Sequence, residues 1–143
     1  MKFDRKRLVY GVGMGAAVTA TVLIGAGPAA AAGDLTVRSV ASGNYAYMAG
    51  TMDFYADGDD FQVCDNSFDS AGVAGYWKIG SGGDVTKIYN GNGAGASDCV
   101  WRTTHNFAET SVVYIRVCLQ DNGDVQNGTC SGWKSIRANG SNP

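Results

Sequence analysis

The sequence predicts an all-β protein, a small antiparallel β-sandwich of about 7–9 strands held by two disulfides. Three observations lead to this prediction. Apolar residues recur at every second position in several short segments, as in strands with one buried face. Glycine-rich turns separate these segments, and no helical periodicity occurs after residue 32. All four cysteines, an even number, also lie after that point.

The clearest predicted element is a hairpin at residues 112–133. Its first arm, VVYIRVCL, alternates with a period of two and is rich in β-branched residues. Asn122 and Gly123 then supply the positive φ angles that a two-residue hairpin turn needs. This stretch is therefore expected to form the framework of the fold.

The cysteines are expected to form two disulfides, for which three pairings are possible. Cys118 and Cys130 lie on either side of the predicted hairpin turn, so we favour a bond between them. That choice leaves Cys64 to pair with Cys99. Each bridge is expected to contribute roughly 2–4 kcal/mol to stability.

The first 32 residues have the pattern of a secretory signal peptide. Residues 1–7 are cationic, residues 8–24 are apolar and uncharged, and Pro28 precedes the small residues 29–32. This order predicts export with cleavage after Ala32, and a secreted, extracellular protein whose cysteines are oxidised. A membrane anchor is the alternative, but the apolar run is short for a bilayer span and contains glycines.

Cleavage at that point would leave residues 33–143, enough for one domain with a single core. It would remove four of the 11 Lys and Arg and one of the 13 Asp and Glu, leaving seven against twelve and a net charge of −5. No basic patch survives in the sequence. We therefore expect no nucleic-acid partner and, after signal cleavage, no membrane partner.

Residues 33–44 begin this predicted mature chain, with Leu35 and Val37 in alternation. Two interpretations are open. The segment is the first strand of the domain, or it is an extended segment that adds to the sheet of another protein. We define residues 33–44 as an N-terminal extended segment and residues 45–143 as the disulfide-bonded sandwich domain.

The other strands follow from alternation and from turn signals. Residues 44–56 alternate through Tyr45 and Tyr47, with a bend expected at Gly50, and Asp57-Gly58 is a second hairpin turn. Further strands are expected at residues 61–64, 73–79, 85–90, 99–103 and 133–137.

No segment has a recognisable catalytic or metal-binding pattern. The acidic stretch 53–69 fails the EF-hand template, because Gln62 and Phe68 occupy the positions of the required glycine and glutamate when counting starts at residue 57. His105 is the only histidine, and no nucleophile motif accompanies it. A carboxylate pair for glycoside hydrolysis has no evident members. We expect no enzymatic activity, no metal and no cofactor.

Aromatic side chains are better candidates for function, because exposed rings form glycan platforms and protein hot spots. Trp77 alternates with apolar residues and is expected in the core, which places Tyr76 on the opposite side of the strand. Two further tyrosines lie near the N-terminus and share one predicted face. The candidate partner-binding residues are Leu35, Val37, Tyr45, Tyr47 and Tyr76.

Several stretches within residues 45–137 resemble small exported proteins common in Streptomyces and its relatives. They are FQVCDNSFDSAG, DCVW, FAET, YIRVCLQD and GTCSGW. These motifs are cysteine placements and turns, so the resemblance implies a two-disulfide β-sandwich rather than an activity.

In size and outline the chain is also similar to the adaptor subunit of the umbrella toxin particles of Streptomyces. This resemblance implies a secreted, non-enzymatic linker between a lectin subunit and a repeat-containing toxin. It also implies that residues 33–44 insert into a partner cleft. The leading hypothesis from the sequence is therefore an adaptor that links other secreted proteins. The alternatives are a carbohydrate-binding, lectin-like domain and a small inhibitor of secreted enzymes.

Overall fold

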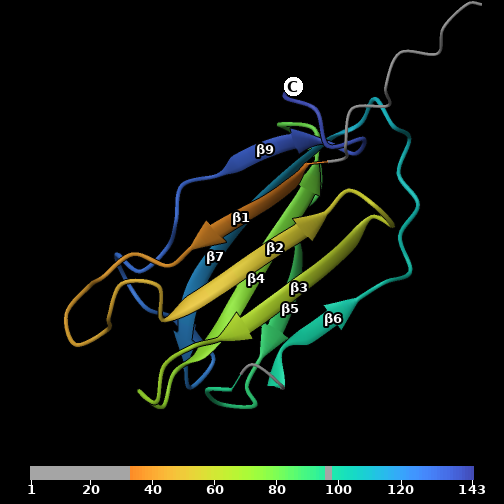
Figure 1. The fold of residues 1–143 in the computed structure, drawn as a ribbon. Helices are drawn as coiled ribbons and strands as arrows, with labels where there is room; N and C mark the ends of the chain where they lie inside the picture. The colour runs from red at the N-terminus through yellow and green to blue at the C-terminus, as the bar shows by residue number, and fades with distance from the viewer. Residues whose placement is uncertain (1–32, 96–97) are drawn as a thin grey trace, which may run out of the picture.

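The computed structural model describes residues 33–95 and 98–143, and the predicted signal peptide at residues 1–32 lies outside them. Two antiparallel sheets pack face to face, and the described part contains no α-helix (Figure 1). One sheet has the order β1 (Asp34–Arg38), β2 (Gly50–Tyr55), β3 (Asp60–Asp65), β6 (Val100–Arg102). The other has the order β5 (Thr86–Asn90), β4 (Gly72–Ile79), β7 (Val112–Asp121), β8 (Asp124–Val125), and β9 (Lys134–Arg137) also pairs with β7. The predicted all-β antiparallel sandwich is confirmed.

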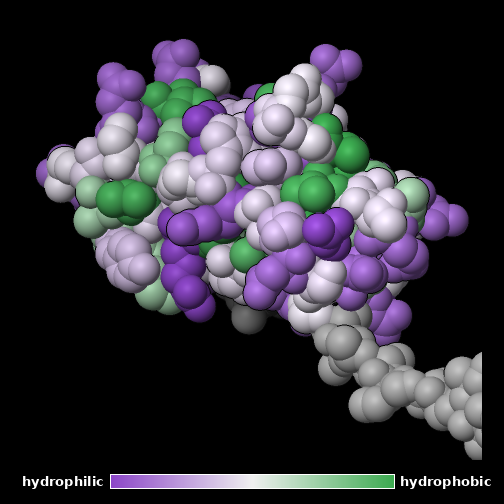
Figure 2. All heavy atoms as spheres, turned by 90° about the horizontal axis from the view of Figure 1, so that it is seen from above, coloured by the Kyte–Doolittle hydropathy of each residue, from purple (hydrophilic) through white to green (hydrophobic). Residues whose placement is uncertain are grey.

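The core lies between the sheets because the strands alternate apolar and polar residues. Met52 and Phe54 of β2 and Phe61 and Val63 of β3 point inward and have no exposed surface. The ring centroids of Phe54 and Phe61 are 5.1 Å apart. The facing sheet contributes Val73, Ile88, Val113, Ile115, Val117, Leu119 and Ile136. On the face of the molecule seen in Figure 2, by contrast, hydrophobic residues form separate small groups among hydrophilic ones.

Both predicted disulfides are present. Cys64 bonds Cys99 with their Cα atoms 4.3 Å apart, and Cys118 bonds Cys130 with theirs 4.0 Å apart. The register places Cys64 and Cys118 on the outer side of each sheet, so each bridge fastens a later segment to that side. Two disulfides indicate an oxidising compartment. Within the described residues no helix is long and apolar enough to cross a membrane.

The predicted hairpin is confirmed at its first arm and its turn, where Asn122 and Gly123 have φ angles of 49° and 92°. The returning arm is less regular than a strand, since β8 contains two residues. Beyond it, the hydroxyl of Thr129 accepts from the Leu119 amide at 3.1 Å, and that of Ser131 accepts from the Val117 amide at 3.0 Å. Hydroxyl oxygens thus replace backbone carbonyls along part of this edge of β7.

The prediction of a strand over residues 44–56 is wrong for the first half of that range. Ser42 and Tyr45 exchange backbone hydrogen bonds of 3.0 and 3.2 Å around a reversal at Gly43, whose φ angle is 57°. This tight turn overrides the alternation of the tyrosines, because glycine adopts such angles without strain. The strand β2 therefore begins only at Gly50.

Residues 34–38 form β1, the edge strand of the four-stranded sheet, and pair along their whole length with β2. Of the two interpretations of this segment, the first strand of the domain is thereby confirmed. Residues 34–38 alternate because Val37 packs into the core while its neighbours on the strand face outward.

The close approach of the sheets can be tested at Gly75, on the inner face of β4. A β-carbon there would lie 2.6 Å from Val63 Cγ2 and 2.8 Å from Met52 Sδ. Gly75→Ala is expected to lower the free energy of unfolding by about 1–3 kcal/mol, because the core has no room for the methyl group.

The matched control is Gly82→Ala, where a β-carbon would meet nothing within 4 Å. Its expected effect is within about 0.5 kcal/mol. Urea denaturation of both variants measures the difference, and equal midpoints would contradict the packing of β4 against β2 and β3.

Candidate functional site

Five side chains on the outer side of the five-stranded sheet form an alternating stack of cations and rings. This cation–aromatic face consists of Tyr76, Lys78, Tyr114, Arg116 and Trp133. The Arg116 guanidinium lies 5.3 Å from the Tyr76 ring centroid and 5.1 Å from that of Trp133. The Lys78 ammonium lies 5.0 Å from the Trp133 centroid and 5.6 Å from that of Tyr114. Each cation is therefore held between two rings.

Strand pairing explains how residues distant in sequence meet here. Tyr76 lies opposite Arg116 and Lys78 lies opposite Tyr114 in the pairing of β4 with β7. Trp133 arrives from the irregular segment before β9, which the Cys118–Cys130 bond holds beside β7. The disulfide of the hairpin thus helps to position the ring that contacts both cations.

The cation–aromatic face is positively charged although the described residues include only seven Lys and Arg against twelve Asp and Glu. The register also places Lys87 of β5 and Arg137 of β9 on this side. None of the described residues of β4, β5, β7 and β9 places a carboxylate there. The Nε atom of Arg116 is buried with no acceptor among the described residues, so ring contacts hold its guanidinium.

The outer side of the four-stranded sheet is acidic on balance. Its acidic face consists of Asp34, Asp53 and Asp60, and the register places one cation, Arg38, on the same side. The hydroxyl of Thr36 donates a hydrogen bond to Asp53 Oδ1. Beside these acids, Tyr55 and Trp101 stack with their ring centroids 5.4 Å apart. The sandwich therefore presents a cationic and an acidic side in opposite directions.

The predicted partner-binding residues do not form one surface. Val37 is 4% exposed and packs in the core with the half-buried Leu35, because both face inward from β1. Tyr45 is also half-buried against the core, whereas Tyr47 is 63% exposed on the loop before β2. Only Tyr76 belongs to the cation–aromatic face.

Tyr47 lines a shallow groove beside the edge of β1. The groove has a volume of about 220 Å³ and also contains Thr36, Arg38, Ser131 and Lys134. Two of these residues are cations from different sheets. The groove thus lies between β1 and β9, and the loop that carries Tyr47 forms part of its lining.

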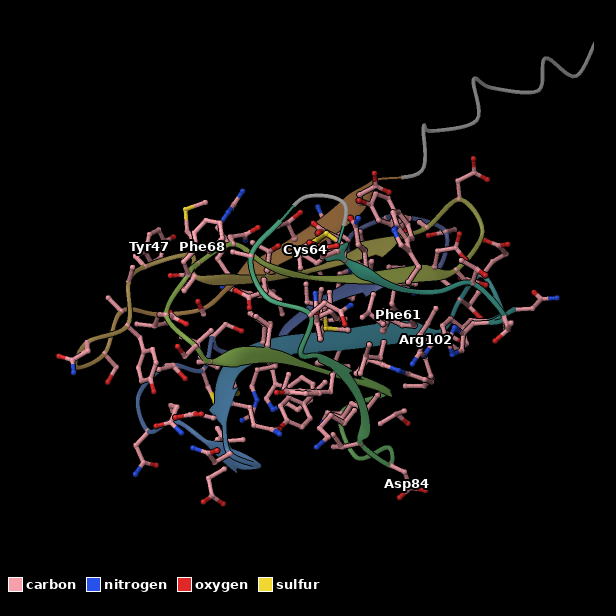
Figure 3. The ribbon with its side chains drawn as sticks, turned by 90° about the horizontal axis from the view of Figure 1, so that it is seen from below. Tyr47, Phe61, Cys64, Phe68, Asp84 and Arg102 are labelled. Atoms are coloured by element: carbon pink, nitrogen blue, oxygen red, sulfur yellow. A yellow bond between two sulfur atoms is a disulfide. The ribbon has the colours of Figure 1, made fainter. Side chains whose placement is uncertain are left out.

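His105 packs in a cluster of aromatic rings. Its ring lies edge-on to Phe61 and to Trp77, with centroid distances of 5.2 and 5.0 Å, and stacks on Phe107 at 5.4 Å. Figure 3 shows Phe61 between the two sheets. The turn residue Asp59 accepts from the Phe107 amide at 2.6 Å, so one member of the acidic stretch anchors the segment that carries His105.

The sequence prediction missed Lys78, Arg116 and Trp133 as a group. The available signal was that Tyr76 and Lys78 alternate with Trp77, as Tyr114 and Arg116 alternate with the apolar residues of the hairpin arm. Pairing the two polar faces required the strand order, which the sequence alone does not specify. No group of three potential metal-ligating side chains occurs in residues 33–95 and 98–143.

No protein-family model, curated protein or solved structure matches this chain. The function of the chain is therefore inferred from its own residues and their arrangement.

The acidic face predicts a pH dependence of stability. Burial raises the pKa of Asp53 above its ordinary value of 3.8, although the Thr36 hydrogen bond and the Arg38 charge oppose the rise. Between 3.8 and the raised pKa the folded chain binds more protons than the unfolded chain. The stability from this carboxyl is therefore present at low pH and lost as the pH rises through the folded pKa.

Asp53→Asn is expected to flatten this part of the profile, because the amide does not ionise. Urea denaturation at pH values from about 3.5 to 7 measures it, and Asp57→Asn in the exposed turn before β3 is the control. Parallel profiles for the Asp53 variant and the unsubstituted protein would contradict the effect of burial on Asp53.

Proposed function

We propose that this chain is a secreted, non-enzymatic protein-interaction module that acts as an adaptor between other secreted proteins. The observation that carries the proposal is the cation–aromatic face. Two disulfides and the signal-peptide pattern of residues 1–32 support the secreted location.

The chemistry of this face suits a protein partner with an acidic surface. Tyr, Trp and Arg are the residue types that dominate interface hot spots, and all three occur together here. Because Arg116 and Lys78 are already held between rings, less side-chain freedom is lost when a partner binds. Carboxylates of the partner would form charge-assisted hydrogen bonds with the guanidinium of Arg116 and the ammonium of Lys78.

An adaptor also needs a second surface, and the acidic face supplies one of opposite charge on the other side of the sandwich. Partners of unlike charge would be steered to different faces and would not compete. In a particle like the umbrella toxins, the two partners would be a lectin subunit and a repeat-containing toxin. Because β1 pairs with β2, the proposed adaptor uses its two faces and not a free N-terminal arm.

Charge reversal at the centre of the cation–aromatic face tests the proposal. A tagged form of the chain is incubated with culture medium of the producing organism, and the captured secreted proteins are quantified by mass spectrometry. Arg116→Glu is expected to lower capture of one partner by more than about tenfold, through repulsion of its acidic surface.

The control for that experiment is Arg102→Glu, the same change at an exposed residue of β6 outside the stack. It is expected to capture the partner as well as the unsubstituted chain does. Capture that is equal for all three forms, or no captured protein at all, would refute the proposed adaptor role.

A further inference from the structure

A polar hollow of about 390 Å³ lies at the end of the sandwich where the loops after β3 and after β5 meet (Figure 1). This volume is within the range of about 300–1,000 Å³ found for small-molecule sites. The side chains used below are Asp65, Ser67, Phe68, Ser70, Tyr89 and Asn92. The hollow shares no residue with the cation–aromatic face, although Lys87 on that side lies 5.9 Å from the ring centroid of Tyr89. Nothing in the proposed adaptor role requires the hollow.

A buried carboxylate lines the hollow. Asp65 is 2% exposed, and its Oδ1 accepts from the Ser67 amide at 3.1 Å. On the same loop, Oδ2 of Asp69 is buried without a hydrogen-bond partner among the described residues. Burial raises the pKa of Asp65, the Ser67 hydrogen bond lowers it, and the nearby Asp69 raises it again. A buried acceptor of this kind favours a ligand that donates hydrogen bonds without a negative charge.

Two aromatic rings stand at the rim. Phe68 is 93% exposed, and Figure 3 shows it outside the two sheets. Two side-chain hydrogen bonds brace its loop. Asp65 Oδ1 accepts from the Ser67 amide on one side of Phe68, and Asp69 Oδ1 accepts from the Ala71 amide at 3.0 Å on the other. Phe68 thus offers an exposed apolar ring on a braced loop beside the hollow.

Two glycines leave the space that the ring of Tyr89 occupies. A β-carbon on Gly72 would lie 2.8 Å from Tyr89 Cζ, and one on Gly91 would lie 2.8 Å from Tyr89 Cε1. Glycine at both positions therefore allows the ring to lie against the backbone at the start of β4 and just after β5. The ring is 42% exposed, so part of it remains open to a ligand.

We propose that this hollow binds a neutral saccharide. Phe68 and Tyr89 pack on the apolar face of a sugar ring, and Asp65 accepts hydrogen bonds from its hydroxyl groups. Ser67, Ser70 and Asn92 add donors and acceptors for the remaining hydroxyls. Anions are disfavoured by the carboxylates of Asp65 and Asp69. A lone ammonium group would leave the several hydroxyl and amide groups of the lining unused.

The test applies the intact chain, from residue 33 onward, to an array of neutral mono- and oligosaccharides. Titration calorimetry with the best binder then gives the affinity. Phe68→Ala is expected to weaken binding by about tenfold, because one stacked ring is lost. Asp65→Asn keeps the acceptor for the Ser67 amide but loses the charge-assisted bonds, so binding weakens by a similar factor.

Val85→Ala is the control for truncation of an exposed apolar residue, since Val85 is 54% exposed and lies outside the hollow. It is expected to bind the sugar normally. Arg116→Glu is also expected to bind the sugar normally, which separates this proposal from the adaptor role. Three results would overturn the saccharide site: no array sugar binds, the Phe68 variant binds as well as the control, or tetramethylammonium binds in preference to every sugar.

Discussion

One buried side chain joins the two sheets, and both outer faces depend on it. Asn90 ends β5 without exposed surface, and its Nδ2 donates to the Val63 carbonyl of β3 in the other sheet at 3.0 Å. The same amide nitrogen donates to the Asp98 carbonyl at 2.9 Å, and Oδ1 accepts from the Asn92 amide. In a mostly apolar core these bonds favour one register, because any slip would leave buried polar groups unpaired. The Cys64–Cys99 bond fastens the segment before β6 to β3 within the four-stranded sheet, next to the Asp98 carbonyl that Asn90 contacts.

This register determines what the molecule shows to solvent. With Val63 facing inward, Asp34, Asp53 and Asp60 must point outward together. The same rule applied to β4 and β7 brings Tyr76 and Arg116 side by side. Charge separation between the two sides of the sandwich is thus a consequence of core packing. The loops that the Asn90 bonds hold in place also form one wall of the hollow at the end of the sandwich.

The sequence was sufficient where one local signal dominated. The alternation of the hairpin arm, the Asn122-Gly123 turn and the pairing of Cys118 with Cys130 follow from short-range geometry, and the structure confirms them. The alternation at Tyr45 and Tyr47 led to a wrong strand prediction. Glycine at position 43 lets the chain reverse without backbone strain, and this turn outweighs a short alternating pattern. The cation–aromatic face could not be predicted, because it requires knowing that β4 and β9 flank β7 on either side. The buried position of Val37 likewise follows from pairing and not from its own neighbours.

The proposed function requires one chain to bridge two partners through opposite faces. Zero-length coupling of amines to carboxylates in untreated culture medium, followed by mass spectrometry of the cross-linked peptides, tests it most directly. The predicted result is that Lys78 and Lys87 couple to one secreted protein, while Asp34 and Asp60 couple to a second. Coupling of both faces to the same protein, or coupling only within this chain, would contradict the account.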